Sequence, residues 1–458
     1  MNSSIKTRWL GKGILAGLIA GVVMSTIMLL EAWLLGIATP LAIFGDRISA
    51  WIPADTFLAL MGRVGGYNHM KQLGVVSVLG GQLVVGAIGG AIYAFATRER
   101  RPSAAVTFLV FVLLPLVAVA ALLWPVLGTH YTGLPMTRAT VVTILGLALA
   151  FIAFERTLVL GTRYLLSART AEAAPEFSPS IGRRALVLGG IGVLAAGGGA
   201  AVLRQLYRLA TFSYDGLQIK GRTVQPITPN DQFYCVTKNV VDPQVSAALW
   251  RLEVNGLVKQ RQTYKIERLK ALPPVTQETT LMCISNGLDA GLMSNAVWKG
   301  VPMRALLQNA TPIDGATRVR IHGVDNYTDT IPLEKALEAT TLIVYEMNGE
   351  PLPHRHGFPA RAIVPGYFGE KHVKWITRIE VADESAKGFY ENQGWGPDFI
   401  VPTRSRIDQP DHGTSIPLST AANGLPIRGM AFGGDRGISK VEVSTDDGET
   451  WDEAKLDY

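Results

Sequence analysis

Three segments between residues 231 and 375 concentrate side chains that can do chemistry, and two of them contain a cysteine. Cys283 stands in Thr280-Leu-Met-Cys-Ile-Ser-Asn286, within an apolar run typical of a strand. A thiol in such a run is commonly a small buried hydrophobic group. Outside the cytoplasm it could also form a disulfide with Cys235. Its functional interpretation is a thiolate ligand for a soft metal such as molybdenum or copper.

The second segment combines cationic side chains with glycine and proline. It comprises His354-Arg-His-Gly-Phe-Pro-Ala-Arg361 and Val364-Pro-Gly-Tyr-Phe-Gly-Glu-Lys-His-Val-Lys-Trp375. A solvated charged face does not need these glycines, whereas a polyanion site does, because the backbone must come close while arginine and lysine reach oxygen atoms. We therefore expect a phosphate-bearing cofactor here. Nucleic acid is a poor partner, since no broader basic stripe surrounds the segment.

The third segment is Asp231-Gln-Phe-Tyr-Cys-Val-Thr-Lys-Asn239, in which aromatic residues precede a basic residue and a carboxamide. This pattern predicts a strand that ends in hydrogen-bonding side chains. Taken alone, the segment is also typical of an ordinary half-buried strand, so its function depends on the other two segments.

The elements that must carry these segments divide into a membrane part and a water-soluble part. Of the 458 residues, 48% are hydrophobic and only 17% are charged, against about 25% charged residues in ordinary soluble domains. Five apolar stretches are long enough to cross a bilayer. They run approximately Gly13–Ile37, Leu73–Ala96, Ala104–Leu127, Ala139–Phe154 and Ala185–Leu203. After Tyr207, polar turns alternate with short mixed strands, as in a folded soluble domain.

Lysine and arginine mark the cytoplasmic ends of these spans. They concentrate in the N-terminus, in the loop at residues 98–101 and in the linker at residues 163–184. With these segments inside, five crossings place everything after Arg204 outside the cytoplasm. We therefore expect a multi-pass protein of the cell (inner) membrane whose soluble domain lies on the periplasmic or extracytoplasmic side.

An arginine pair stands at the start of the fifth stretch. Arg183 and Arg184 precede the apolar, glycine-rich Ala185–Leu203, a pattern typical of twin-arginine export signals, which carry proteins already folded around a cofactor. The same pair also satisfies the positive-inside rule for an ordinary span. Both interpretations stay open on the residues alone.

Haem is not expected in this chain. No CxxCH motif is present, and the two cysteines, Cys235 and Cys283, exclude a disulfide scaffold and a four-cysteine zinc site. A haem held between spans would need paired histidines inside the membrane, but His69 and His130 both stand in flanking segments.

Several linked motifs, in order along the chain, resemble the sulfite oxidase family of molybdopterin-dependent oxidoreductases, here of a membrane-anchored bacterial type. They are Cys283 in its strand, Trp298-x-Gly-Val-Pro302, Tyr345-Glu-Met-Asn-Gly-x-Pro-Leu-Pro353, His356-Gly-Phe-Pro-x-Arg361, Val364-Pro-Gly366 and His372-Val-Lys-Trp375. The resemblance covers about residues 225–410, and no comparable resemblance covers the spans. Ile427–Trp451 resembles the start of the family's immunoglobulin-like C-terminal domain.

The resemblance implies a molybdenum–molybdopterin cofactor and assigns residues to it. Cys283 would be the protein's thiolate ligand on molybdenum. The residues implied to hold the pterin and its phosphate are Val236, Thr237, Lys238, Asn239, Asp325, His356, Arg361, His372, Val373 and Lys374. Arg361 and Lys374 suit phosphate oxygens, while His356 and Asn239 suit ring edges. The implied chemistry is two-electron oxygen-atom transfer with a small substrate such as sulfite.

The departures from the family's pattern concern the substrate. Lys238 stands where sulfite-oxidising members have an arginine, so the charge is kept and the planar fork is lost. Trp395 falls where they have the active-site tyrosine, and tryptophan offers neither the acceptor nor the proton of a phenol. Cys283, Lys238 and Trp395 are the catalytic candidates. The family's late substrate arginine has no counterpart before Tyr458, which suggests that the chain stops partway into its last domain.

These observations predict a multi-domain protein with an α-helical transmembrane bundle of about five spans, an α+β sulfite oxidase-type molybdopterin-binding domain and a partial immunoglobulin-like β domain. The expected boundaries are 1–162 for four spans, 163–184 for a cytoplasmic linker, 185–206 for the fifth span or signal anchor, 207–412 for the molybdopterin-binding domain and 413–458 for the last, dimerisation-type domain.

Three functions stay open at this point. The first is oxygen-atom transfer in the manner of sulfite oxidase, favoured by His356, His372-Val373 and the residues after Ile427. The second is reduction of an S- or N-oxide, such as methionine sulfoxide, at the same site. The third is a non-catalytic, membrane-anchored protein that binds a ligand. Either enzyme needs an external electron carrier, such as a cytochrome c or a quinone-linked membrane protein, and the resemblance allows a homodimer.

Overall fold

The structure of the protein is a computed structural model that describes most of the chain. The described residues are 3–49, 51–53, 56, 59–60, 63–65, 67–98, 101–167, 197–198, 201, 204–205, 226–287, 291–396, 399–410, 413–417, 419, 422 and 424–457. The Arg183-Arg184 pair and nearly all of the fifth expected span lie outside the described residues.

Two compact units make up the structure. Unit 1 comprises Met1–Phe212, Thr237–Leu249 and Val324–Asn326, and unit 2 comprises Ser213–Val236, Trp250–Gly323 and Tyr327–Tyr458. Unit 1 is helical, and unit 2 is built on two five-stranded sheets. Residues 237–249 and 324–326, which the sequence places in the soluble domain, therefore group with the helices.

With the exception of Pro40–Ser49, the helices of unit 1 coincide with the first four apolar stretches. They are α1 (Ser3–Leu35), α2 (Pro40–Ser49), α4 (Tyr67–Ala96), α5 (Ala104–Phe108), α6 (Leu114–Leu123) and α7 (Met136–Ser167). Four segments of the described residues are long and apolar enough to cross a membrane, namely Trp9–Leu35, Asn68–Ala96, Ala104–Leu123 and Met136–Leu166. The expected stretch to Leu127 ends at Leu123 instead, in the 3-10 turn η2 (Trp124–Val126), because Pro125 lacks the N–H that would continue the helix.

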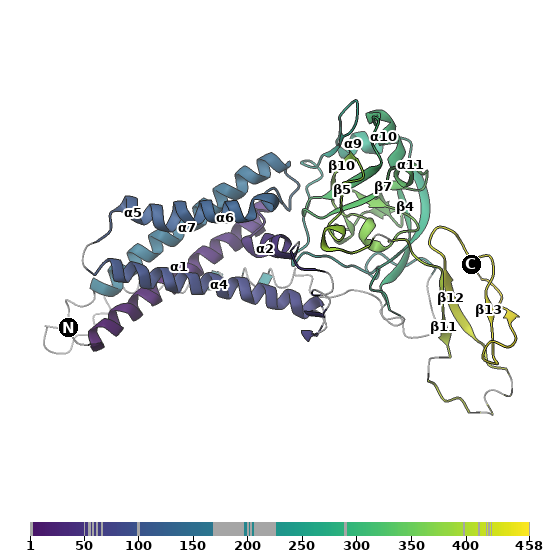
Figure 1. Ribbon diagram of the computed structural model, residues 1–458, viewed down its shortest axis with the longest axis horizontal. Helices are drawn as coiled ribbons and strands as arrows, with labels where there is room; N and C mark the ends of the chain where they lie inside the picture. The colour runs from purple at the N-terminus through teal and green to yellow at the C-terminus, as the bar shows by residue number, and fades with distance from the viewer. Residues whose placement is uncertain are drawn as a thin grey trace. The chain divides into compact units, whose positions relative to one another are not determined.

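Close contact between α1 and α4 depends on glycine. The two helices pack along their length, and both also contact α7 (Figure 1). A Cβ atom at Gly17 would overlap the carbonyl oxygen of Gly86, and one at Gly90 would overlap that of Gly13. The small-residue spacing of both segments thus serves close helix approach, the usual role of such motifs in lipid.

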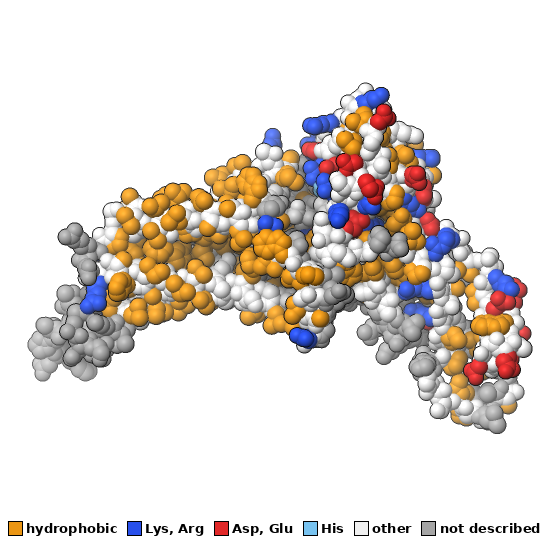
Figure 2. Space-filling model, in the orientation of Figure 1, with side chains coloured by type: hydrophobic (Ala, Val, Ile, Leu, Met, Phe, Trp, Pro, Cys, Tyr) orange, Lys and Arg blue, Asp and Glu red, His pale blue; other side chains and the backbone are white. Residues whose placement is uncertain are grey.

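The outer surface of the helices is apolar. Figure 2 shows hydrophobic side chains over most of the visible face of the helices, whereas lysine, arginine, aspartate and glutamate gather over the sheets. Val76, Phe95 and Leu145 are 68%, 71% and 64% exposed. A water-soluble surface rarely carries so large a continuous apolar area, and the arrangement is compatible with membrane anchoring.

The first sheet of unit 2 has the strand order β2-β1-β10-β5-β6. Its strands are β1 (Leu252–Gly256), β2 (Gln262–Tyr264), β5 (Arg318–Gly323), β6 (Thr328–Pro332) and β10 (Ile376–Ala382). β1 and β10 run parallel, and the other neighbours are antiparallel. The fully buried Trp250 fixes the position of the first residue of β10, because its indole N–H donates a hydrogen bond to the carbonyl of Ile376 at 2.7 Å.

The second sheet pairs β3-β4-β7-β8, with β9 also on β7. Its strands are β3 (Val275–Met282), β4 (Met293–Pro302), β7 (Leu342–Met347), β8 (Glu350–Pro351) and β9 (Arg361–Ile363). One face buries Leu281, Trp298, Leu342 and Val344 in a single hydrophobic cluster. The aromatic ring of Phe233 packs edge-on against Trp298 in that cluster.

Short elements connect and cover the strands. They are α9 (Ile266–Lys270), α10 (Met303–Ala310), α11 (Leu333–Leu337) and the 3-10 turns η3 (His354–His356), η4 (Gly369–Lys371) and η5 (Glu391–Gln393). The C-terminal residues form two antiparallel pairs, β11 (Arg404–Gln409) with β12 (Arg428–Phe432) and β13 (Glu442–Val443) with β14 (Asp452–Glu453). The immunoglobulin-like assignment of this part stays a prediction.

Two expected strands are wrong in detail. Cys283 is the first residue beyond β3 and not within the strand. The segment 231–239 forms turns and bends in place of the expected strand, because side chains take up its backbone groups: the amide of Tyr234 donates to Ser294 Oγ, and that of Asn239 to Thr237 Oγ1.

Candidate functional site

The turn after β3 presents Cys283. Its amide donates to the carbonyl of Leu292 at 2.9 Å, and its own carbonyl accepts the amide of Asn286 at 3.0 Å. The Asn286 side chain in turn accepts the amide of Leu292 at 2.9 Å. The Cys283 sulfur lies 3.1 Å from Ser285 Oγ. These bonds hold the thiol in one orientation at the end of a well-paired hairpin.

The environment of Cys283 favours the neutral thiol. Burial raises its pKa, although hydrogen bonds from Ser285 lower it in part. The buried Tyr234 lies within electrostatic range of Cys283, Cys235 and Arg361, and burial raises the pKa of its hydroxyl well above the ordinary value. A bound metal cation would deprotonate such a thiol. Both cysteines are free, so the disulfide between Cys235 and Cys283 is not formed.

Arg361 joins two segments of the basic motif. Its guanidinium donates to the carbonyl of His356 at 3.1 Å and to that of His372 at 3.0 Å, and it stacks 5.2 Å from the ring of Trp298. The side chain is buried and its Nε has no partner among the described residues. Burial lowers its pKa to about 10, so it stays charged near neutral pH.

Two histidines of the motif, His356 and His372, are neutral. His356 Nε2 lies 3.0 Å from the carbonyl of Asn230, and burial lowers its pKa to about 3, with Arg361 and Lys374 contributing. His372 Nδ1 accepts the amide of Val364 at 3.1 Å, and burial lowers its pKa to about 3 as well. Each imidazole therefore acts as a hydrogen-bonding group and not as a cation.

Lys374 and Val373 complete this part of unit 2. Lys374 Nζ donates to the carbonyl of Arg355 at 3.0 Å, lies 3.6 Å from Cys235 Sγ and stacks on Trp375. Val373 is buried, and its carbonyl accepts the amide of Ala362 at 2.9 Å. The ion pairs of the described residues include none to Arg361 or Lys374.

Four other cofactor candidates gather in unit 1. Asn239 donates to Asp325 Oδ2 at 2.7 Å and to Thr237 Oγ1 at 3.1 Å. Lys238 Nζ donates to the backbone carbonyl of Asp325 at 2.7 Å. Asn239 and Asp325, which stand 86 residues apart, are both buried. The structure thus brings Thr237, Lys238, Asn239 and Asp325 together as one polar cluster.

Val236 and Trp395 occupy different parts of unit 2. Val236 packs against the hydrophobic cluster that contains Phe233 and Trp298. Trp395 lies in the turn after η5, with its ring 5.1 Å from that of Tyr390. Its indole Nε1 is a buried donor without a partner among the described residues. It can therefore donate to an acceptor that the protein itself does not supply.

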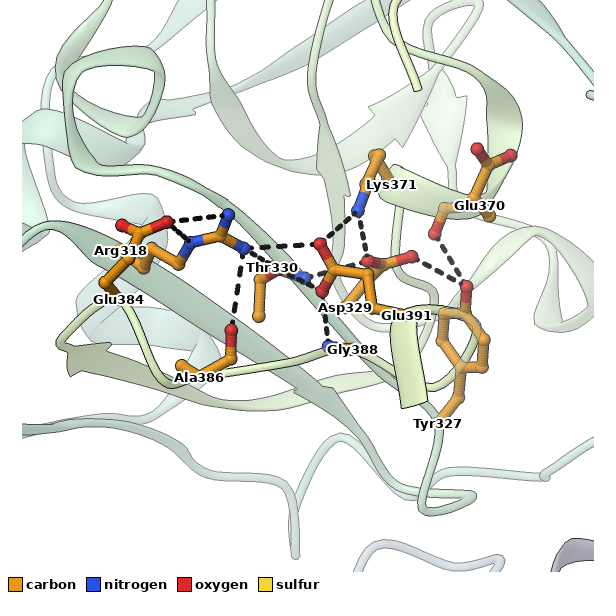
Figure 3. A network of polar contacts seen from close by, with 10 residues as sticks. All are labelled: Arg318, Tyr327, Asp329, Thr330, Glu370, Lys371, Glu384, Ala386, Gly388 and Glu391. Carbon is orange, nitrogen blue, oxygen red and sulfur yellow. Dashed lines mark hydrogen bonds and ion pairs between the residues drawn. The ribbon is translucent and has the colours of Figure 1, made fainter. Parts of the chain in front are cut away.

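A buried ionic network holds η4, directly before His372. Lys371 Nζ lies 2.6 Å from Asp329 Oδ1 of β6, and both side chains are buried (Figure 3). The Glu391 carboxylate lies 3.8 Å from the same ammonium. It also accepts two hydrogen bonds, one from the Thr330 hydroxyl at 2.5 Å and one from the backbone amide of Gly388 at 2.6 Å. The network therefore fixes η4 to β6 and to the turn that carries Trp395.

Glu370 is an unexpected buried acid beside this network. The hydroxyl of Tyr327 bridges Asp329 and the backbone carbonyl of Glu370 at 2.9 and 3.1 Å (Figure 3). Glu370 Oε1 is buried without a partner among the described residues, and burial raises the pKa of its carboxyl to about 8. At neutral pH it is therefore mostly protonated.

Sequence reasoning missed Tyr234, Glu370, Lys371 and Asp329 as parts of the site. The first three stand inside the motifs that the sequence singles out, so their position was the available signal. No spacing rule points to Asp329, because it stands 42 residues from Lys371 and reaches it only through the fold.

Comparison with known proteins gives two adjacent family matches. The oxidoreductase molybdopterin binding domain matches residues 239–390, and the Mo-co oxidoreductase dimerisation domain matches residues 399–458. The mitochondrial sulfite oxidase of Drosophila melanogaster is 34% identical over 272 residues, which is 50% of this chain and 47% of that protein. The chain belongs to the sulfite oxidase family of molybdenum oxidoreductases.

The likeness to a nitrate reductase is also partial. NADH nitrate reductase 2 of Phaseolus vulgaris is 30% identical over 285 residues, which is 51% of this chain and 32% of that protein. The chain thus spans about half the length of the sulfite oxidases and about a third of this nitrate reductase. The crystal structure of sulfane dehydrogenase SoxCD from Paracoccus pantotrophus aligns with a TM-score of 0.44 and 24% identity, covering 52% of this chain and 66% of that one.

The cofactor of this sulfite oxidase-family chain is molybdenum–molybdopterin, and the residues of unit 2 fit its chemistry. Arg361 and Lys374 are cations to which the ion pairs of the described residues assign no carboxylate. The orphaned Nε of buried Arg361 and the neutral His356 are suited to phosphate oxygens and ring heteroatoms. Burying a cation without a counter-charge is costly unless a bound anion offsets it.

Replacement of Lys371 by methionine should destabilise the protein strongly, because Asp329 would be left as a buried, uncompensated charge. Breaking a buried pair in this way costs about 3–5 kcal/mol. Thermal unfolding of the detergent-purified chain measures the effect. Lys299→Met is the matched control, since its ion pair with Glu346 is partly exposed to solvent and should contribute far less. An equal decrease of the unfolding temperature in the two variants would contradict the role assigned to Lys371.

Acid should destabilise the cofactor-free chain through His356 and His372. Their pKa values are about 3 in the folded chain, whereas an unfolded histidine has a pKa of about 6.5. Unfolding between these values takes up protons, so this stability is fully present above pH ~6.5 and is lost as the pH falls towards 3. Each group contributes at most ~1.4 kcal/mol per pH unit.

The measurement is the unfolding temperature of the cofactor-free chain between pH 7.5 and 4.5. His372→Gln keeps one acceptor and one donor but does not titrate, so its stability should depend less steeply on pH. Identical slopes in the wild type and in this variant would contradict the assignment.

Proposed function

We propose that the chain is a membrane-anchored, extracytoplasmic molybdenum oxidoreductase that moves an oxygen atom to or from a small substrate in a two-electron reaction. Cys283 is the protein's ligand to molybdenum in this proposal. The observation that carries it is the cationic pair of the buried Arg361 and the half-buried Lys374 in the same unit as Cys283, with Tyr234 in electrostatic range of both Cys283 and Arg361. Such a group favours an anionic cofactor over a neutral one.

The protein's residues hold and orient the cofactor. Arg361 and Lys374 contact its phosphate, and His356 donates to or accepts from the pterin edge as a neutral imidazole. The resemblance adds the Thr237–Asn239 segment and Asp325 of unit 1 to this set. Cys283 supplies a thiolate that Ser285 orients. When bound, molybdenum–molybdopterin supplies the two-electron redox change and the exchangeable oxygen atom.

The substrate is a small oxyanion or oxide in this proposal. Lys238 and Trp395 replace the arginine and tyrosine of sulfite-oxidising members, and both replacements keep a hydrogen-bond donor. The unpaired Nε1 of Trp395 supports this role, since a buried donor without a partner is rare unless a ligand or water completes it. Sulfite is the first candidate substrate, because sulfite oxidases stand among the relatives.

The membrane location rests on the helices of unit 1. Four apolar helices and their exposed hydrophobic side chains support an anchor, and the distribution of lysine and arginine supports a periplasmic soluble domain. An external cytochrome c or a quinone-linked protein would exchange electrons with the site. The match to the dimerisation domain supports a homodimer.

Exchange of Cys283 for serine tests the metal site. We expect wild-type protein to contain molybdenum and to show a Mo(V) signal in electron paramagnetic resonance during turnover. Cys283→Ser should lower turnover by more than the 10- to 100-fold typical of residues that only support a ligand, and it should abolish the wild-type Mo(V) signal. Cys235→Ser is the thiol control and should keep the metal.

Two outcomes would refute the proposal. Wild-type protein free of molybdenum when purified from a host that makes the cofactor would point to the non-catalytic binding protein. An unchanged Mo(V) signal in Cys283→Ser would show that Cys283 does not bind molybdenum, and the proposed site would then have no protein ligand to the metal.

The direction of the reaction is the second question, and the similarity to a nitrate reductase makes reduction the second candidate after oxidation. We expect sulfite with ferricyanide as acceptor to give the higher kcat/KM, and methionine sulfoxide with reduced viologen dye to give the lower one. Steady-state assays of the same preparation decide between them. Turnover of the sulfoxide alone would assign the chain to S-oxide reduction.

A further inference from the structure

Lys71 of α4 binds a segment that lies far away in the sequence. Its ammonium donates to the backbone carbonyl of Thr237 at 2.5 Å and to that of Asn239 at 2.8 Å. All three residues belong to unit 1, and 166 and 168 residues separate the lysine from its two acceptors. Lys71 stands near the start of the apolar helix segment Asn68–Ala96, where an ammonium needs oxygen partners to offset its desolvation.

The two carbonyls flank Lys238, a cofactor and catalytic candidate. Because this segment forms no strand, its backbone oxygens depend on donors from elsewhere. A single ammonium that binds the carbonyls on both sides of Lys238 fixes the path of the backbone there. Lys238 itself reaches the carbonyl of Asp325, and Asn239 reaches its carboxylate. Lys71 therefore fixes the backbone that carries Lys238 and Asn239, two members of the polar cluster that the family resemblance assigns to the cofactor.

A second contact attaches the same segment to the helical unit. The amide of Ser246 donates to the carbonyl of Thr132 at 3.0 Å. Val245 is buried and packs so closely over Gly133 that a Cβ there would lie 2.9 Å from its side chain. Gly133 also has a φ of +88°, which favours glycine. Two separate contacts within unit 1 thus hold residues 237–249, and the Lys71 contact is the one of the two that involves cofactor candidates.

We propose that Lys71 is a positioning residue of the cofactor site, so that the helical unit contributes to cofactor retention in addition to anchoring the chain. This inference rests on the proposed function, since it takes Lys238 and Asn239 as cofactor-binding residues. Lys71 contacts the backbone of the segment and not the reacting atoms. Its loss should loosen the segment while Cys283, Arg361 and Lys374 stay unchanged.

The test is a graded series at Lys71 in the full-length, detergent-purified holoenzyme. Arginine can still donate to both carbonyls, glutamine to one and methionine to none. We expect the rate of pterin and molybdenum loss during dialysis to rise at least about tenfold in Lys71→Met, because two charge-assisted hydrogen bonds disappear. Lys71→Gln should lie between, and Lys71→Arg should restore retention. Metal content and the fluorescence of released, oxidised pterin give both readouts without an activity assay.

Lys12→Met is the charge-matched control, because it removes the same ammonium from α1 of the same unit. It should retain pterin like the wild type. Should Lys71→Met fail to fold, the comparison of Lys71→Gln with Lys71→Arg decides the question.

Equal retention throughout the series would overturn the inference while leaving the proposed function intact. Wild-type protein without pterin would instead refute the proposed function itself. A loss in Lys71→Met that Lys71→Arg does not restore would also overturn the positioning role, since the hydrogen bonds would then not be the cause.

Discussion

The ion pair between Lys371 and Asp329 is the constraint on which the arrangement of unit 2 depends. Both groups are buried, and the pair is closed by hydrogen bonds from Tyr327 and Thr330 to the same carboxylate. A buried charge tolerates little movement, because any separation exposes it to an apolar interior. The pair therefore sets the position of η4 on β6, and with it the start of the His372–Lys374 segment.

Arg361 connects the 364–375 segment of the basic motif to the 354–361 segment. By donating to the carbonyls of His356 and His372 it holds both segments at one place. Burial keeps the neighbouring imidazole of His356 neutral, and the positive charges of Arg361 and Lys374 lower its pKa further. The outcome is a rigid, cationic site whose charge the described protein residues leave uncompensated. Such a site lowers the free energy of unfolding of the empty protein, and a bound anion raises it again.

Sequence patterns anticipated the elements whose information is local. Apolar stretches located most helices of unit 1, and ordered motifs identified the family and the cofactor, since spans and motifs consist of consecutive or closely spaced residues. Patterns failed at 231–239, where the alternation of side chains predicts a strand but Ser294, Thr237 and Lys71 take the backbone bonds that a ladder would use. These partners stand up to 168 residues away, beyond the reach of any local rule.

The sequence by itself determined which chemistry is available: a thiol, a set of cations among glycines, and apolar helices long enough to span a bilayer. Only the tertiary structure decided which of those groups meet. It paired Lys371 with Asp329, seated Arg361 between two histidine segments, and bonded Lys71 to the carbonyls beside Lys238. The physical reason is that composition and spacing follow from the order of residues, whereas desolvation and hydrogen bonding depend on which groups the fold buries together.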